Sequence, residues 1–166
     1  IVGRLYFYKF CYFFAVSNYC SHEAMLFVFC SPVGPYFKGG MKPIKVIIDR
    51  VQDRAAPRGT GDIKAGGNYA SSIFSGEKAH QMGYSNVMYL DATEHKYIEE
   101  CGAANFFGIK DGKYITPKSP SILPSITNKS LRTLAEDMGL QVEERPIPVS
   151  ERLCSQNPSV SVQYYP

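Results

Sequence analysis

The chain has 166 residues, of which 45% are hydrophobic and 20% are charged, and its formal net charge is +3. This length suits one domain with a buried core, but it is too short for two large domains. The composition excludes disordered and collagen-like proteins, and the small net charge argues against a nucleic-acid-binding surface. Of the 22 rings supplied by 12 Tyr and 10 Phe residues, 12 lie in residues 1–37, which marks the front of the chain as a different kind of segment.

Residues 1–37 carry only three charged side chains, so a membrane span or an export signal has to be considered. The longest uncharged apolar run, residues 10–16, is far shorter than the roughly 20 residues that a spanning helix needs. A signal peptide is the alternative, but no convincing small-residue cleavage site follows Val16. Aromatic and β-branched residues at positions 5–12 and 25–29 favour two buried strands instead.

The five cysteines form no CxxC pair, and no spacing of Cys and His residues fits a zinc site. An odd count without such pairs is typical of reduced thiols in a cytoplasmic protein, so we expect a cytoplasmic location. The three histidines are isolated from one another, and we expect them at the surface or in helix caps rather than on a metal. We therefore expect no metal site and no membrane association.

Predicted strands and helices alternate from residue 42 onward, which is typical of an α/β or α+β domain. The predicted strands are residues 42–48, 87–90, 97–101, 105–109, 114–116 and 142–147. The sequence Asp111-Gly112 between two of them is typical of a β-hairpin turn. Pro146 places the last strand at a sheet edge or ends it there. The tail after residue 152 shows no periodicity, and we expect it to be irregular.

Two helices are expected among these strands. Asn68 is well placed to cap the first helix, which runs to about Met82 and ends before Gly83. The second helix follows a proline- and serine-rich loop and ends at Gly139. Its apolar face has the spacing i, i+3, i+4, i+7 and consists of Leu131, Leu134, Ala135 and Met138.

The stretch GTGDIKAGGNYA, residues 59–70, encloses the single lysine Lys64 among four glycines. Glycines permit tight turns and the close approach of a bulky group, so Lys64 is a candidate amine for imine formation. An ordinary lysine on a surface loop is the alternative, and the stretch alone does not decide between the two. Walker-type phosphate binding is excluded, because no Lys-Ser or Lys-Thr follows the required glycine spacing.

A second feature is the start of the second predicted helix at Ser125, Ile126 and Thr127. Free backbone amides and the positive end of the helix dipole favour an anion there, and the two hydroxyls add further donors. An ordinary helix cap is the alternative, since every helix has such an end.

A third feature is the pair Glu99 and Glu100 at the end of an apolar segment. Neighbouring side chains on a strand point to opposite faces, so one glutamate can be internal while the other meets water. An inward carboxylate needs a cationic partner, or it takes up a proton. A solvated pair at a strand end is the alternative. Together, a lysine, an anion-binding helix end and a carboxylate are what a protein contributes to pyridoxal phosphate chemistry.

The segments FCSPVGPYF, GTGDIKAGGNYA, YLDATEHKYIEECGAANFF and TPKSPSILPSITNKSL resemble the branched-chain amino acid aminotransferases, which are class IV aminotransferases of fold type IV among the pyridoxal phosphate enzymes. The resemblance runs from about residue 24 to residue 152 and implies an α/β (α+β) fold. Residues 1–37 would be the last strands of a small domain and the interdomain crossing. Residues 38–152 would be part of the large, cofactor-binding domain, and residues 153–166 an irregular tail.

The resemblance also implies a role for each matching residue around the reactive end of the cofactor. Lys64 would be the Schiff-base lysine and the catalytic base and acid. Tyr69 would reach the phenolic oxygen of the cofactor and, with Ala103, contact the substrate. Glu100 would pair with the pyridine nitrogen, which leaves Glu99 as the outward member of the pair.

The remaining implied contacts hold the ring and the phosphate. Ile126 and Thr127 would bind the phosphate, and Leu123 would pack against the ring. Asn105 matches the asparagine that follows the glutamate in this family, so it would support the site. No residue is expected to bind a metal.

The implied activity is transamination of leucine, isoleucine and valine with 2-oxoglutarate, which gives branched-chain 2-oxo acids and glutamate. The resemblance further implies a role in branched-chain amino acid biosynthesis, a homodimer, and no nucleic-acid partner. This chain departs from the family at Tyr8, where the family pattern Leu-Tyr-x-Arg-Pro has an arginine, and family members are longer. The alternatives are a truncated, non-catalytic derivative or another type IV enzyme, either a D-amino acid aminotransferase or an aminodeoxychorismate lyase.

Overall fold

The computed structural model describes residues 2–9, 13–14, 17–18, 24–32, 43–151 and 162–164. The chain divides into two compact units, Ile1–Lys42 and Pro43–Pro166. Assigning these units to a small and a large domain stays a prediction. In the described ranges, neither helix combines the length and the apolar character that crossing a membrane requires.

The first unit is built from paired strands. β1 (Val2–Lys9) pairs antiparallel with β4 (Ala24–Ser31), and its register runs from Val2 opposite Ser31 to Lys9 opposite Ala24. The short strands β2 (Phe13–Phe14) and β3 (Ser17–Asn18) follow β1 and precede β4 in the sequence, and they pair antiparallel with each other. The strand conformation expected in this segment is therefore confirmed where it is described, whereas the expected burial of these strands stays a prediction and residues 10–12 lie outside the described residues.

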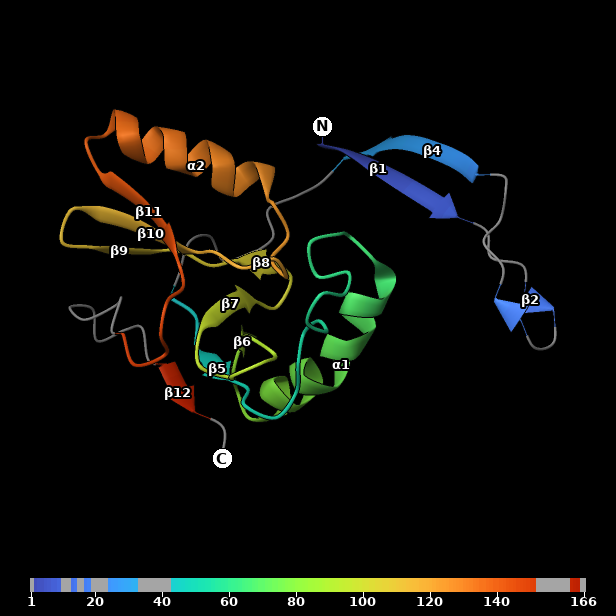
Figure 1. The fold of residues 1–166 in the computed structure, drawn as a ribbon, viewed down its shortest axis with the longest axis horizontal. Coiled ribbons are helices and arrows are strands. Elements are labelled where there is room, and N and C mark those ends of the chain that lie inside the picture. The colour runs from blue at the N-terminus through green and yellow to red at the C-terminus, as the bar shows by residue number, and fades with distance from the viewer. Residues whose placement is uncertain are drawn as a thin grey trace. The chain divides into compact units, whose positions relative to one another are not determined.

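The second unit contains a five-stranded sheet with the order β12-β5-β6-β7-β8 (Figure 1). Its strands are β5 (Val46–Ile48), β6 (Asn86–Leu90), β7 (Ile98–Cys101), β8 (Ala104–Asn105) and β12 (Val162–Tyr164). β12, β5 and β6 are parallel, whereas β7 pairs antiparallel with both β6 and β8. A mixed sheet with helices confirms the expected α/β (α+β) class.

The side chains of β5 and β6 are buried on both faces of this sheet. Ile47, Val87 and Tyr89 pack on one face with Ala79 of α1 (Gly66–Gln81). The other face carries the larger core, which consists of Ile48, Met88, Leu90, Ile98, Ile115 and Ile147. This alternation follows the period of two residues along a strand. Burial on both faces holds β5 and β6 in place, and the connector that follows β5 contributes to the candidate site.

A second sheet has the order β11-β10-β9, from β9 (Gly108–Lys110), β10 (Lys113–Pro117) and β11 (Gln141–Arg145). β9 and β10 form the predicted hairpin, and its turn residues Asp111 and Gly112 have φ values of 50° and 72°. Positive φ at both positions is the requirement of a type I′ turn, which Asn-Gly and Asp-Gly sequences satisfy.

β10 and β11 are parallel, so the chain has to cross over between them. The crossover is α2 (Ile126–Asp137), which packs against β11 (Figure 1). As part of this connection, the loop of residues 118–125 and the first turn of α2 lie beyond the carboxyl end of β10. β11 ends at Arg145, directly before Pro146, and lies at the sheet edge, as predicted.

Four expectations about these elements need correction. The expected strand 105–109 is divided between β8 and β9, which belong to different sheets. Asn68 does not cap α1, because the helix begins at Gly66 after Ala65 and has no side-chain cap. The apolar face of α2 is buried only in part, since Ala135 is 5% exposed but Met138 is 79% exposed. Within the tail that we expected to be irregular, Val162–Tyr164 form β12 and pair with β5.

Candidate active site

The connector after β5 carries Arg54 into the interior of the second unit. Asp49 follows β5, and its Oδ1 accepts hydrogen bonds from the amides of Val51 at 2.8 Å and Gln52 at 3.0 Å, which turns the chain. The hydroxyl of Ser71 on α1 donates to the carbonyl oxygen of Arg54 at 2.8 Å. The side chain of Arg54 is only 6% exposed, so its positive charge is held inside the protein.

Asn68 anchors the glycine-rich loop to the first turn of α1. Its Nδ2 donates to the carbonyl oxygens of Thr60 at 2.6 Å and Ile63 at 3.0 Å, and its Oδ1 accepts from the Thr60 hydroxyl at 2.9 Å. These bonds explain why an asparagine is buried at this position, because they satisfy its amide within the protein. They also fix the backbone that precedes Lys64.

Lys64 and Tyr69, which the sequence predicts to act together, are in contact. The Nζ of Lys64 donates to the hydroxyl oxygen of Tyr69 at 3.1 Å and lies 5.8 Å from the centre of its ring. Tyr69 lies in the first turn of α1, and Lys64 in the anchored loop before it. Both side chains are exposed, so the amine is accessible to a ligand.

Glu100 on β7 is 4% exposed, and its carboxylate has partners on both oxygens. Oε1 accepts hydrogen bonds from Nδ2 of Asn105 at 2.8 Å and from the amide of Leu123 at 2.9 Å. Oε2 lies 3.2 Å from Nε of Arg54. Burial raises the pKa of Glu100 above its ordinary value, and the Arg54 charge and the two hydrogen bonds oppose that rise.

The guanidinium of Arg54 also joins two loops that are far apart in the sequence. Its Nη2 donates to the carbonyl oxygens of Gly61, at 3.4 Å, and of Ser121. Gly61 is required at this point, because a Cβ would overlap the Ser121 carbonyl oxygen. The two loops therefore approach each other closely at one cation.

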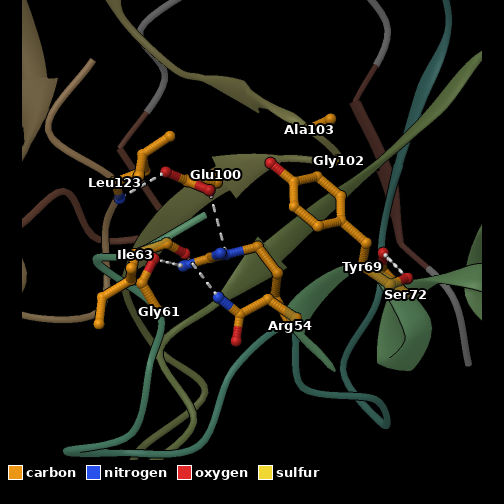
Figure 2. Close-up of a pocket in the computed structure, with 10 residues that line it drawn as sticks. Arg54, Gly61, Ile63, Tyr69, Ser72, Glu100, Gly102, Ala103 and Leu123 are labelled. Carbon is orange, nitrogen blue, oxygen red and sulfur yellow. Dashed lines mark hydrogen bonds and ion pairs between the residues drawn. The ribbon is translucent and has the colours of Figure 1, made fainter. Parts of the chain in front are cut away.

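These residues surround one pocket, and Figure 2 shows Arg54 and Leu123 meeting the Glu100 carboxylate from different sides. The pocket is lined by Arg54, Gly61, Ile63, Asn68, Tyr69, Ser72, Glu100, Gly102, Ala103 and Leu123. Four of the residues predicted from the sequence, Tyr69, Glu100, Ala103 and Leu123, are thus brought together. Lys64 adjoins them through its contact with Tyr69.

The expectation that Glu99 is the outward member of the glutamate pair is wrong. Glu99 is buried and, like Glu100, only 4% exposed. Its carboxylate accepts a short hydrogen bond from the hydroxyl of Ser119. β7 lies between β6 and β8, and the loop after β10 covers the face to which Glu99 points. Burial raises the pKa of Glu99, while the Ser119 hydrogen bond and the Arg54 charge act in the opposite direction.

Ile126 and Thr127, the predicted phosphate ligands, are the first two residues of α2. Their amides therefore belong to the first turn, in which backbone donors have no partner within the helix. Ser125 caps the helix by accepting from the amide of Asn128 at 3.2 Å. Neither Ile126 nor Thr127 lines the pocket of Figure 2, but Nδ2 of Asn128 lies 3.4 Å from Oδ1 of Asn105. The helix start is thus connected to the site through Asn105.

Arg54, Asn68 and Asn128 belong to the site or contact it, and no sequence motif predicts them there. An inward carboxylate needs a cationic partner, and three arginines lie in residues 50–58, so the sequence offers three candidates for this partner. Nothing in the sequence distinguishes Arg54 from the other two. The roles of Asn68 and Asn128 depend on contacts with loops, which no local pattern predicts.

In the part of the chain that the structure describes, no group of three or more His, Cys, Asp or Glu side chains is arranged to hold a metal ion. Cys101, at the end of β7, is a free thiol there, and burial raises its pKa to about 11. A thiol with a raised pKa is a poor nucleophile at neutral pH, so Cys101 is not a candidate nucleophile.

Comparison with known proteins identifies the class to which this arrangement belongs. The model of the family Amino-transferase class IV matches residues 12–156, and the chain belongs to that family. The branched-chain-amino-acid aminotransferase of Helicobacter pylori is 55% identical over 132 residues, which cover 78% of this chain and 39% of that protein. This chain thus spans about two fifths of the length of that relative.

Two solved structures support the same assignment. The branched-chain amino acid aminotransferase from Escherichia coli is 34% identical with a TM-score of 0.57, and the match covers 63% of this chain and 35% of that one. The T.th. enzyme of the same name, complexed with N-(5'-phosphopyridoxyl)-L-glutamate, is 27% identical with a TM-score of 0.57, over 63% of this chain and 35% of that one. The predicted family and fold are confirmed, whereas the role of each residue stays a prediction.

Proposed function

We propose that this chain carries the cofactor-binding part of a branched-chain amino acid aminotransferase that uses pyridoxal phosphate. The observation that carries the proposal is the contact between the Lys64 amine and the Tyr69 hydroxyl, 3.1 Å apart, beside a pocket lined by Tyr69 and Glu100. Membership in the class IV family and 55% identity to the Helicobacter pylori enzyme support it.

The residues present fit this cofactor. Pyridoxal phosphate has an aldehyde, a phenolic oxygen, a ring nitrogen and a phosphate, and each has a suitable partner in the chain. Lys64 is an accessible amine next to a phenol, and Glu100 is a buried carboxylate with a cationic partner. The first-turn amides of Ile126 and Thr127 suit a phosphate, because a helix N-terminus favours an anion.

Pyridoxal phosphate, when bound, supplies a carbonyl carbon that takes up an amine and a ring that withdraws electrons from the substrate Cα. Lys64 would hold the cofactor through Nζ and, once the substrate amine replaces it, would take the proton from Cα and pass it on. Tyr69 would orient the amine through its hydroxyl, which accepts from Nζ. Glu100 would hold a proton on the ring nitrogen.

The substrates we propose are leucine, isoleucine and valine, with 2-oxoglutarate as the amino acceptor. Ile63, Ala103 and Leu123 bring apolar groups to the pocket, which suits aliphatic side chains that have no polar group to recognise. The proposed homodimer rests on the resemblance alone, and the proposed cytoplasmic location rests on the odd number of cysteines without a CxxC pair. Sedimentation of the protein in solution tests the first, and cell fractionation tests the second.

Borohydride trapping tests the proposed cofactor chemistry. The chain is incubated with pyridoxal phosphate, reduced, digested and mapped by mass spectrometry, and we expect the phosphopyridoxyl group on Lys64. Lys64→Ala should lose the adduct. Lys96→Ala is a matched control, because Lys96 also lies over a tyrosine ring, 5.3 Å from the centre of Tyr97. An unmodified Lys64, or equal labelling of both lysines, contradicts the proposal.

The substrate class is tested by a half-reaction with the loaded protein. L-Leucine should convert bound pyridoxal phosphate to pyridoxamine phosphate, which is identified by chromatography after release. D-Alanine and aminodeoxychorismate should give none. Conversion by D-alanine in place of leucine would point to another enzyme of the same class, and no conversion by any of the three would favour a non-catalytic derivative.

A further inference from the structure

We propose that Arg54 is a positioning residue that keeps Glu100 ionised, so that the Glu100 carboxylate can hold a proton on the ring nitrogen of the cofactor. The inference rests on the proposed function, because the ring nitrogen belongs to pyridoxal phosphate. It adds a residue that acts through Glu100 and need not touch the cofactor itself.

Arg54 is held in place by contacts with three separate segments. Its carbonyl oxygen accepts from Ser71 on α1, and its Nη2 donates to the carbonyl oxygens of Gly61 and Ser121. With the side chain 6% exposed, the guanidinium has no route to solvent without breaking these contacts. The positive charge is therefore a fixed part of the pocket wall (Figure 2).

The partners of Glu100 decide which of its oxygens can take a proton. Oε1 accepts from the amide groups of Asn105 and Leu123, and neither donor can accept a hydrogen bond in return. A proton on Glu100 would therefore go to Oε2, the oxygen that lies 3.2 Å from Nε of Arg54. A cation at that distance in a buried site strongly disfavours a proton there.

The contact between Arg54 and Glu100 acts through charge rather than through a well-directed hydrogen bond. The Nε–H group of Arg54 is buried and points at no described acceptor, although Nε and Oε2 are close. A neutral side chain of similar shape at this position would keep the packing but lose the effect. This difference separates a charge role from a purely structural one.

The other charges near Glu100 do not replace Arg54. Glu99 is buried next to it on β7, and the charge of Glu100 itself favours a proton on Glu99. Lys64 helps to lower the pKa of Glu100, but it is the last of the opposing influences, and its amine is the group that the cofactor would occupy. Arg54 is the largest influence that holds the pKa of Glu100 down against burial.

Infrared spectroscopy of the chain without cofactor gives the first test. We expect no carbonyl band from protonated Glu100 at pH 7 in the unchanged chain, and a clear band in Arg54→Gln. The band is assigned by its loss when Glu100→Gln is added, which separates it from any band of Glu99. Arg54→Lys, which keeps the charge, should show at most a weak band, and Arg58→Gln, at an exposed position, should show none.

Nuclear magnetic resonance of bound pyridoxal phosphate labelled with 15N in the ring gives the second test. The 15N shift should lie at the protonated position in the unchanged chain and move towards the neutral position in Arg54→Gln. Arg58→Gln should leave it unchanged. If Arg54→Gln folds and shows neither the infrared band nor the shift, the inference is overturned.

The two tests separate this inference from the proposed function. If no variant binds pyridoxal phosphate, the proposed function fails while the infrared result still reports on Arg54 and Glu100. If Arg54→Gln does not fold, the double variant Arg54→Gln with Glu100→Gln should fold again, because it removes the uncompensated charge. Failure of the double variant to recover would show that Arg54 acts through packing alone, which also overturns the inference.

Discussion

The side chain of Asn86 occupies the space that a Cβ on Gly102 would need. Gly102 follows β7 directly with a φ of 59°, and its amide donates to the carbonyl oxygen of Val87 at 2.8 Å. Asn86 is fixed by its own contacts, since its Oδ1 accepts from the amide of Val87 at 2.9 Å and its Nδ2 donates to the carbonyl oxygen of Cys101 at 3.3 Å. Gly102, two residues after Glu100, is thus required both by backbone conformation and by space.

We therefore expect Gly102→Ala to destabilise the protein more than Gly112→Ala. Gly112 also has a positive φ, of 72°, but no atom of the described residues lies within 4 Å of its missing Cβ, so Gly112→Ala has only the backbone cost of about 1–2 kcal/mol. Gly102→Ala adds an overlap worth about 1–3 kcal/mol. Urea unfolding of both variants measures the difference, and equal losses would show that Asn86 moves aside freely.

Asn68→Ala should lower the free energy of unfolding by about 2–3 kcal/mol, because it leaves the Thr60 and Ile63 carbonyl oxygens without their donor. It should also make residues 59–65 more susceptible to limited proteolysis. Ser72→Ala is the control, since the Ser72 hydroxyl donates to the Tyr69 carbonyl oxygen one turn earlier in α1 and has no hydrogen bond to the described residues 59–65. Similar proteolysis of the two variants would argue against Asn68 as the anchor of the loop.

Glu99→Gln should remove part of the pH dependence of stability. The folded pKa of Glu99 is raised above its ordinary value of 4.5, so the folded chain binds more protons than the unfolded chain between the two values. The contribution of Glu99 to stability therefore falls as the pH rises through that window. Relative to the unchanged chain, Glu99→Gln should gain stability as the pH rises above 4.5.

Thermal unfolding across this pH range measures the effect. Glu136→Gln is the control for the removal of one carboxylate, because Glu136 is exposed on α2. A profile of Glu99→Gln that runs parallel to that of the unchanged chain would mean that Glu99 titrates alike in the folded and unfolded states.

Glu151→Gln should have the opposite pH dependence. The two carboxylate oxygens of Glu151 accept from Nη1 and Nη2 of Arg145 at 2.8 and 2.7 Å, and this pair lowers the pKa of Glu151 below its ordinary value. The stabilisation is thus present at neutral pH and is lost as the pH falls through the lowered pKa. We expect a loss of about 0.5–1 kcal/mol at pH 7, which is small because the pair is partly exposed, and no loss near pH 2. Chemical denaturation at both pH values checks this, and equal losses at both would exclude the charge pair as the cause.

Local features of this fold could be predicted from the sequence, and non-local ones could not. Asp111-Gly112 determines its hairpin turn and Pro146 ends its strand, because both act through the conformation of their own backbone. The burial of Glu99 depends on a loop that reaches it from β10, and the role of Arg54 depends on Ser121, 67 residues away. The contact of Lys64 with Tyr69 was predictable because both belong to one short motif.

The hydrogen bond from the Leu123 amide to Glu100 provides a natural probe of the site. This backbone hydrogen exchanges with solvent only when the loop of residues 118–125 separates from β7. Its exchange rate, followed at a single amide, therefore reports how often the carboxylate loses its surroundings. Since the measurement needs neither a cofactor nor a substrate, it can rank variants of the whole site by local opening alone.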